Sequence, residues 1–253
     1  MSFAAGTFVG GIVSMTRFGS FILLPLFLQQ VLGYNALQAG LTVMPRTLTM
    51  VFTMPILGNL YNRLGVYIML PFGLVVSGAA GFMMSHFTTQ TSHLGILVPQ
   101  IIQGVGFSFM FIPLSTATLS TIPRPLMQSA TGLYNLVRQL GGSLGTAIVI
   151  TILDHKTTTA STNLVRYASF SNPLFMSWWS QLQAGLQARG SDAATAHRQA
   201  LAVLQHWIGQ QSAVVAFDYV FALVGAVFII CLPVVLLIRD RDLERMAAGA
   251  PAE

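Results

Sequence analysis

Residues 128–147, QSATGLYNLVRQLGGSLGTA, form an apolar, glycine-rich stretch that contains one arginine, Arg138, and no acidic residue. About 20 apolar residues are enough for a helix to cross the hydrocarbon core of a membrane, so this stretch predicts a membrane-spanning helix. An ionised side chain at that depth costs about 3 kcal/mol or more, and it therefore faces protein or a water-filled cavity rather than lipid. Arg138 is thus a candidate site residue.

The same pattern occurs earlier in the chain. AGL at 39–41 precedes RTL at 46–48 with four residues between them, as TGL at 131–133 precedes RQL at 138–140. The two segments are expected to lie three spans apart and to cross the membrane in opposite directions, which is typical of an inverted repeat. Chance similarity is the alternative, because glycine and leucine are common in this chain.

The composition indicates an integral membrane protein. Hydrophobic residues make up 54% of the 253 residues and charged residues 8%, where about 25% charged is usual for a soluble domain. The net charge is +5, but several basic residues lie beside expected membrane boundaries, which favours a role in orientation over nucleic-acid binding. The one cysteine, Cys231, lies in an apolar run and is interpreted as a small hydrophobic residue.

Six spans are predicted, near residues 4–29, 37–60, 65–86, 93–120, 127–153 and 213–238. Residues 1–153 then hold the first five spans, 154–212 an outer, periplasmic loop, 213–238 the sixth span and 239–253 a cytoplasmic tail. The tail is basic at its start, and Arg63 and Arg124 fall in connectors on the same side. The positive-inside rule therefore places both termini in the cytoplasm.

The outer loop contains a segment with helical periodicity. Ser191 or Asp192 can cap this helix, and Ala200, Leu204 and Trp207 share one of its faces. We expect an amphipathic helix that lies at the outer interface of the membrane. A docking surface for a periplasmic partner is the alternative.

Charged residues inside the spans are few. Arg17, Arg46 and Arg138 lie within the first, second and fifth spans, and Asp218 is the only acid within a predicted span. Ionisable residues inside a membrane mark functional sites by default, so these four are candidate site or gating residues. Small residues also recur at four-residue spacing, as at 141 and 145, which predicts close packing between helices.

An enzymatic or metal site is disfavoured. GGSLG at 141–145 matches the G-x-S-x-G pattern of hydrolases, but Ser143 lies inside a span, and the five histidines lie at span ends or in loops. No H-E-x-x-H, no cysteine and histidine cluster and no G-x-x-x-x-G-K-[ST] occurs. The sequence therefore predicts no enzyme, no metal and no bound cofactor.

Four segments carry a family resemblance: LPLFLQQVLGY at 24–34, ALQAGL at 36–41, SATGLYN at 129–135 and RQLGGSLGTA at 138–147. With them the chain resembles the C-terminal half of a major facilitator superfamily transporter, of the EmrB/QacA type of drug:proton antiporter with fourteen spans. The resemblance implies an all-α membrane protein whose six transmembrane helices form one half bundle of two inverted three-helix repeats. It also implies alternating access and proton-driven multidrug efflux at the inner membrane of a bacterium.

The cytoplasmic G-x-L-x-D-R-x-G pattern of that superfamily corresponds to residues 58–65. Gly58 and Arg63 match the pattern, but Asn62 stands where the acid is usual. The gating ion pair is therefore expected to be weak or absent on this side. The N-terminal half of the family is not in this sequence, so the chain is expected to be a fragment, a truncated product or a subunit that pairs with that half or with a second copy.

Seven side chains are expected to line a substrate cavity, with helix packing as the alternative for each: Gln29, Gln103, Phe107, Phe111, Tyr134, Asn135 and Arg138. Aromatic and amide groups suit an adaptable, weakly polar pocket. The expected partners are an amphipathic drug-like substrate, membrane lipid and, from the resemblance alone, a periplasmic adaptor protein. Two alternatives stay open, a non-transporting scaffold or degenerate fragment, and a permease subunit of a multi-chain transporter.

Overall fold

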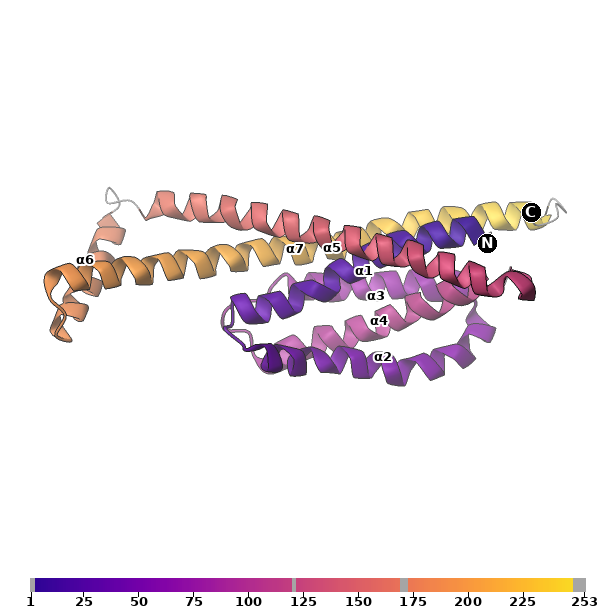
Figure 1. Cartoon of the computed structure of the whole chain (residues 1–253), viewed down its shortest axis with the longest axis horizontal. Coiled ribbons are helices and arrows are strands. Elements are labelled where there is room, and N and C mark those ends of the chain that lie inside the picture. Colours follow the sequence, from indigo (N-terminus) through magenta and orange to yellow (C-terminus); the bar gives the residue numbers. More distant parts are fainter. Residues whose placement is uncertain (1–2, 120–121, 169–172, 248–253) are drawn as a thin grey trace.

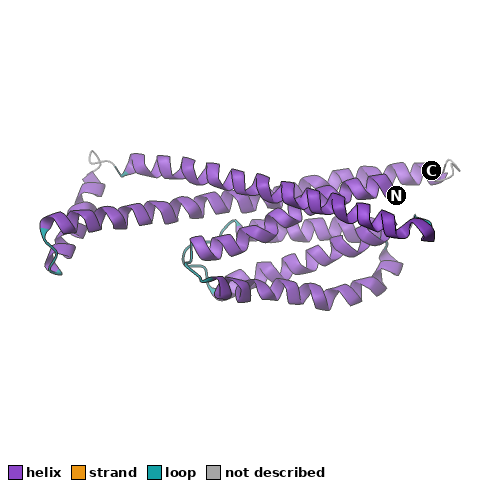
Figure 2. Cartoon of the chain, viewed as in Figure 1, coloured by secondary structure: helices purple, strands orange, loops and turns teal. Residues whose placement is uncertain are grey.

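The structure is a computed structural model that describes residues 3–119, 122–168 and 173–247. These residues are almost entirely helical and include no strand (Figure 1 and Figure 2). The helices are α1 (Phe3–Gln30), α2 (Ala36–Leu64), α3 (Val66–Met84), α4 (His93–Leu119), α5 (Met127–Tyr167), α6 (Pro173–Ala188) and α7 (Ala193–Ala247), with a 3-10 turn at Arg124–Leu126.

Six of these helices are long and apolar enough to cross a membrane. The candidate spans within the described residues are Gly6–Gln30, Ala36–Tyr61, Val66–Met84, His93–Leu119, Arg124–Arg166 and Ala193–Pro233. The predicted all-α architecture with six transmembrane helices is therefore confirmed.

A single residue separates α2 from α3. α2 begins with a capping box, in which the Asn35 side chain accepts from the Gln38 amide and the Gln38 side chain accepts from the Asn35 amide. The helix then continues to Leu64, so the expected connector that contains Arg63 is helical up to that residue. Gly65 makes the turn at a φ of 68°, a conformation that is strained for any residue with a Cβ.

The bundle consists of two equivalent sets of three helices. α1 packs against α5, α4 packs against α2, and α3 packs against α7. If α1, α2 and α3 are taken as equivalent to α4, α5 and α7 respectively, the pair α1–α5 corresponds to the pair α4–α2. The pair α3–α7 corresponds to itself. The arrangement agrees with a half bundle of two three-helix repeats (Figure 1).

Small residues bring helix backbones together at three interfaces. On α5, a Cβ at Gly141 or Gly145 would collide with the α1 backbone, at Gly11 and Met15 respectively. Two further interfaces, α3 with α4 and α3 with α7, use the pairs Ser77–Gly106 and Gly81–Gly225. Helix association in lipid depends on such close packing, because the surrounding chains are as apolar as the side chains. The packing role predicted for the small residues is thus confirmed.

α5 and α7 extend well beyond the other spanning helices (Figure 1). α5 has 41 residues, which is about 60 Å of helix and twice the hydrocarbon thickness of about 30 Å. Lys156 of α5 places its Nζ 3.8 Å from the centre of the Tyr219 ring of α7. α6 packs on α7, where Trp178 stacks on Trp207 with 6.3 Å between the ring centres.

Most of residues 154–212, which were expected to form an outer loop, are helical. Residues 154–167 continue α5, and residues 193–212 form the first part of α7. Residues 193–212 are helical, and the Asp192 carboxylate caps this helix by accepting from the Thr195 amide at 3.3 Å. Hydrogen bonds from Thr195 also hold the pKa of Asp192 below its usual value.

The amphipathic helix differs from the expectation in its direction. It runs on into the sixth span instead of lying flat at the interface, because no proline interrupts the chain between 193 and 232. α7 also continues to Ala247, so residues 239–247 of the expected tail are helical. Residues 248–253 lie outside the described residues.

Candidate functional site

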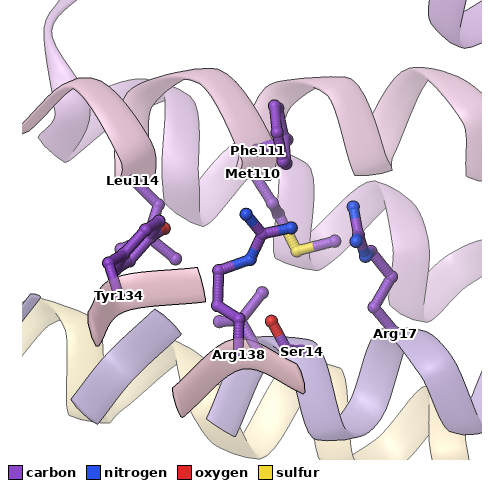
Figure 3. A pocket seen from close by; sticks show the side chains of 8 residues that line it. Ser14, Arg17, Met110, Phe111, Leu114, Tyr134 and Arg138 are labelled. Carbon is purple, nitrogen blue, oxygen red and sulfur yellow. The ribbon is translucent and has the colours of Figure 1, made fainter. Parts of the chain in front are cut away.

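A small hollow opens between α1, α4 and α5 (Figure 3). The open space amounts to about 10 Å³, which is about the room that one water molecule needs. The hollow is therefore too small for a drug-sized molecule and can form only part of the wall of a substrate site. It is lined by Val13, Ser14, Arg17, Met110, Phe111, Leu114, Tyr134 and Arg138.

Two arginine side chains, Arg17 and Arg138, line the hollow. The guanidinium carbon of Arg138 lies 4.9 Å from the centre of the Phe111 ring and 5.5 Å from that of Tyr134. The guanidinium carbon of Arg17, on the neighbouring helix α1, lies 5.6 Å from the centre of the same Phe111 ring. NH1 of Arg138 donates to Oδ1 of Asn135 at 3.3 Å.

No carboxylate lines this hollow. Cation–π contacts contribute about 0.5–2 kcal/mol each, so they offset much of the cost of a charge at membrane depth, about 3 kcal/mol. They do not compensate the repulsion between Arg17 and Arg138, which are both half-buried. Among the described residues, the hollow thus holds two like charges and no acidic side chain.

Four of the seven expected cavity residues meet here. Phe111, Tyr134 and Arg138 line the hollow, and Asn135 is hydrogen-bonded to Arg138. Arg17, expected as a buried charge, joins them. The structure therefore brings together side chains that were expected to line a substrate cavity and one, Arg17, that was expected as a buried charge.

Four lining residues were missed by the sequence analysis. Ser14 precedes Arg17 by three residues and shares its helix face, so helical spacing from Arg17 could have found it. Val13, Met110 and Leu114 are ordinary apolar residues in apolar helices. Nothing in the sequence distinguishes these three from residues that face lipid.

Three expected cavity residues lie outside the hollow. Gln29 is exposed near the end of α1, and its Nε2 donates to a carbonyl of its own helix, that of Pro25, at 3.2 Å. Gln103 and Phe107 are fully buried, and Phe107 contacts Phe228 of α7 with 6.0 Å between ring centres. Gln103 and Phe107 therefore pack between helices, the alternative that the sequence had left open.

A second group of polar side chains is enclosed between α1, α2 and α4. Arg46 of α2 is 0% exposed, and its guanidinium carbon lies 5.0 Å from the centre of the Phe21 ring of α1. Among the described residues, none of its three side-chain nitrogens has a hydrogen-bond partner. The Oε1 atoms of Gln100 and Gln103 on α4 also lack one. Unpaired polar groups in the interior are costly, so Arg46 is a poorly satisfied charge among the described residues.

The hydrogen bond between Gln103 Nε2 and Ser20 Oγ, 2.7 Å long, ties α4 to α1. Such bonds within membranes average about 0.6 kcal/mol and reach about 1.7 kcal/mol. In a double-mutant cycle of unfolding free energies with Gln103→Met and Ser20→Ala, we expect a coupling of about 0.5–1.5 kcal/mol. The same cycle with exposed Gln29→Met in place of Gln103→Met should show none. Additive effects in the first cycle would contradict the bond.

The family profile of the Major Facilitator Superfamily matches residues 2–146. This range is more than half of the chain and includes every residue that lines the hollow, and Arg46 as well.

The chain belongs to the major facilitator superfamily.

Its relatives within the superfamily include named exporters. The multidrug export protein EmrB of Haemophilus influenzae is 30% identical over 199 residues, which are 78% of this chain and 39% of that protein. EmrB of Escherichia coli K12 is 28% identical over 235 residues, 92% of this chain and 44% of that protein. YhcA of Bacillus subtilis, an uncharacterised transporter of the superfamily, is 28% identical over 174 residues, 69% of this chain and 33% of that protein.

These comparisons confirm the resemblance to EmrB-type transporters of the major facilitator superfamily. The matched region spans less than half the length of each of these relatives. The family evidence points to a transporter rather than an enzyme, and the membrane-spanning helices make the chain a multi-pass membrane protein.

The superfamily pattern at 58–65 lies at the end of α2. Gly58 and Arg63 are exposed, and no hydrogen bond or ion pair joins Arg63 to another described residue. The side chain of Asn62 lies outside the described part of the structure. Asp218 is half-buried on α7, and its Oδ1 atom is enclosed without a hydrogen-bond partner among the described residues. The residues expected to act in gating therefore do not meet at one place in this half bundle.

Proposed function

We propose that the chain supplies one half bundle of a secondary transporter that exports amphipathic, drug-like compounds by alternating access. The hollow between α1, α4 and α5 carries this proposal, because it places aromatic and charged side chains on a surface inside the bundle matched by the superfamily profile. The printed names of the EmrB relatives, multidrug export proteins, support the substrate class. Proton coupling is proposed from the resemblance to the drug:proton antiporters.

A second six-helix bundle completes this proposed site. Sites for drug-sized ligands have volumes of about 300–1,000 Å³, whereas the hollow offers about 10 Å³. α2 and α5 also leave apolar stripes exposed at helical spacing, and these can pack against a second bundle or against lipid. They consist of Leu37, Leu41, Met44, Leu48, Phe52 and Ile56 on α2, and of Leu133, Leu136, Leu140, Leu144 and Ile148 on α5.

The partners follow from this arrangement. We propose that the second bundle is the N-terminal half of a longer transporter or a second copy of this chain, and that lipid covers the remaining apolar surface. Both termini are proposed to face the cytoplasm of a bacterium, as the positive-inside rule indicates. The projecting parts of α5 and α7, with α6, then lie on the periplasmic side, where an adaptor protein could dock on them.

Transport can be tested in cells that express the protein from its own locus. We expect them to accumulate several-fold less of at least one dye, from a set of anionic, neutral and cationic amphipathic dyes, than cells without the gene. Collapse of the proton gradient should remove the difference. Equal accumulation of every dye in both strains would contradict the proposed function.

The oligomeric state gives an independent measurement. Crosslinking of the native protein in mild detergent should show a dimer or a complex with a second multi-span chain. A lone six-helix monomer would contradict the proposed second bundle.

A further inference from the structure

The hollow between α1, α4 and α5 indicates which kind of bundle completes the site. We propose that Arg17 and Arg138 pair with an acidic side chain carried by a membrane-spanning helix of the second bundle. That bundle then differs in sequence from this chain and is not a second copy of it. The inference rests on the proposed function, which requires a second bundle, and it specifies this partner without assigning a substrate.

The two guanidinium groups converge on one aromatic ring. The guanidinium carbons of Arg17 and Arg138 lie 5.6 Å and 4.9 Å from the centre of the Phe111 ring. They approach it from different helices, α1 and α5, and Figure 3 shows both side chains extending into the same space. Both arginines are only half-buried within this bundle. A carboxylate on a neighbouring helix can therefore contact both of them.

Most hydrogen-bond donors of the two arginines are uncommitted. A guanidinium group carries five N–H donors, and Arg138 uses one of them for the neutral amide of Asn135. Arg17 makes no hydrogen bond or ion pair to another described residue, and its contacts are with the rings of Phe18 and Phe111. Guanidinium groups bind carboxylates through two parallel hydrogen bonds, so the unused donors match an acidic side chain in both charge and geometry.

The acidic residues of this chain lie far from the hollow where the structure describes them. Asp154 follows Arg138 on α5 by 16 residues, which is about 24 Å along the helix. Asp218 is adjacent to Tyr219, whose ring centre lies 3.8 Å from Nζ of Lys156. Lys156 lies 18 residues beyond Arg138, so Asp218 is about 27 Å from the level of Arg138 along α5. The counter-charge must come from elsewhere.

A second copy of the chain would not supply the counter-charge. Asp218 is the only acid within a predicted span, and a copy inserted in the same direction holds it at the same outer level. The other six acidic residues lie outside the predicted spans, at 154, 192, 240, 242, 244 and 253. Two facing copies would instead bring four arginines together, and like charges repel each other more strongly at low dielectric than in water. A bundle of different sequence, with a carboxylate at the depth of the hollow, removes this repulsion.

The face of α5 beside Arg138 is suited to protein rather than to lipid. Asn135 and Gln139 are about one helical turn apart, and both are exposed. Exposed amide groups at membrane depth are costly unless a protein helix covers them. Oδ1 of Asn135 already accepts from Arg138 at 3.3 Å, which leaves the amide N–H groups of Asn135 and Gln139 for a carboxylate. A helix of the second bundle therefore fits this face.

Zero-length crosslinking identifies the acid directly. The chain contains a single lysine, Lys156, so Lys156→Arg combined with Arg138→Lys leaves one lysine, at the hollow. Dicyclohexylcarbodiimide enters membranes and activates carboxyl groups, and a lysine amine in contact displaces the urea to form an amide bond. In native membranes with the protein expressed from its own locus, we expect this bond to join the introduced lysine to an acid within a span of the second bundle. Peptide mass spectrometry locates both ends.

Arg166→Lys in the same Lys156→Arg background is the matched control, because it places the lysine on the exposed, projecting part of α5. Its yield of amide bond to the span acid should be lower by roughly tenfold or more, since the reaction requires the two groups to be held in contact. Arg17→Lys in that background should react with the same acid as Arg138→Lys. Each of these variants keeps the positive charge of the parent residue.

Charge exchange gives a second measurement that does not depend on transport. Arg138→Glu places a carboxylate opposite the acid of the second bundle, so it should lower the midpoint of thermal unfolding of the complex by roughly 5–10 °C. Replacement of the crosslinked acid by arginine in the same protein should recover most of this loss. Arg166→Glu, which changes an exposed residue on the projecting part of α5, should leave the midpoint unchanged.

The outcomes separate this partner from the proposed function. An amide bond to an acid of a second copy, to a lipid or to a small free acid would overturn the inference, as would the absence of any bond to a span acid from both lysine positions. Charge exchange that recovers none of the lost stability would overturn it too. Each of these results leaves transport standing, because dye export is measured separately. Failure to export any dye would contradict the transport function, while an amide bond to a different bundle would still support the inference.

Discussion

Gly145→Ala is expected to lower the free energy of unfolding by about 1–3 kcal/mol, although it adds a single methyl group. A Cβ at this position would overlap the backbone carbonyl of Met15. A backbone atom cannot rotate away as a side chain can, so α1 and α5 must move apart. Small residues drive helix association in lipid by letting backbones approach, and the substitution removes that approach. Thermal unfolding of the purified protein in detergent measures the effect.

Gly132→Ala is the matched control on the same helix. No atom lies within 4 Å of a Cβ added at Gly132, and alanine is favoured over glycine in a helix by about 0.5–1 kcal/mol. We therefore expect this variant to be as stable as the parent or slightly more stable. If both variants unfold at the same temperature, the close contact between α1 and α5 is not present in the protein.

Arg46→Met is expected to have the opposite effect and to raise the free energy of unfolding by about 1–3 kcal/mol, since apolar replacement of buried charged groups is often stabilising. Arg46 is 0% exposed, and its three side-chain nitrogens have no partner among the described residues. Methionine keeps an unbranched chain that can pack against Phe21. The midpoint of thermal unfolding should rise by about 2–4 °C for each kcal/mol in a protein of this size.

Arg166→Met tests whether loss of an arginine is by itself stabilising. Arg166 is exposed on the projecting part of α5, so its replacement should leave the midpoint unchanged. A lower midpoint for Arg46→Met would contradict the burial of an unpaired charge at this position. It would show instead that Arg46 has a polar or anionic partner in the membrane.

Local sequence was sufficient for most of the fold. The membrane permits only backbone that satisfies its own hydrogen bonds, so long apolar runs must become helices. The six predicted spans and the packing glycines follow from this constraint, and both are confirmed. The prediction for the outer loop was less accurate. Its apolar periodicity indicated a helix, but it did not show that this helix is continuous with the sixth span.

The candidate site was predicted less completely than the fold. Arg138 stood out because a charge is rare in an apolar span, and the structure places it at the hollow. Gln103 was proposed for the cavity because of its polar amide group, yet it lies in the interior and is bonded to Ser20. Polarity within a span therefore marked residues that avoid lipid without showing whether they face a cavity or another helix.

The sequence by itself determined the number of spans, the superfamily and the rarity of charge within the bundle, because these depend on composition and short motifs. Only the tertiary structure decided that Arg17 and Arg138, 121 positions apart in the chain, share the ring of Phe111. The physical reason is that lipid is as apolar as the interior. Exposed Leu133 and buried Leu24 are equally suited to their surroundings, so the sequence pattern does not show which face of a helix points inward.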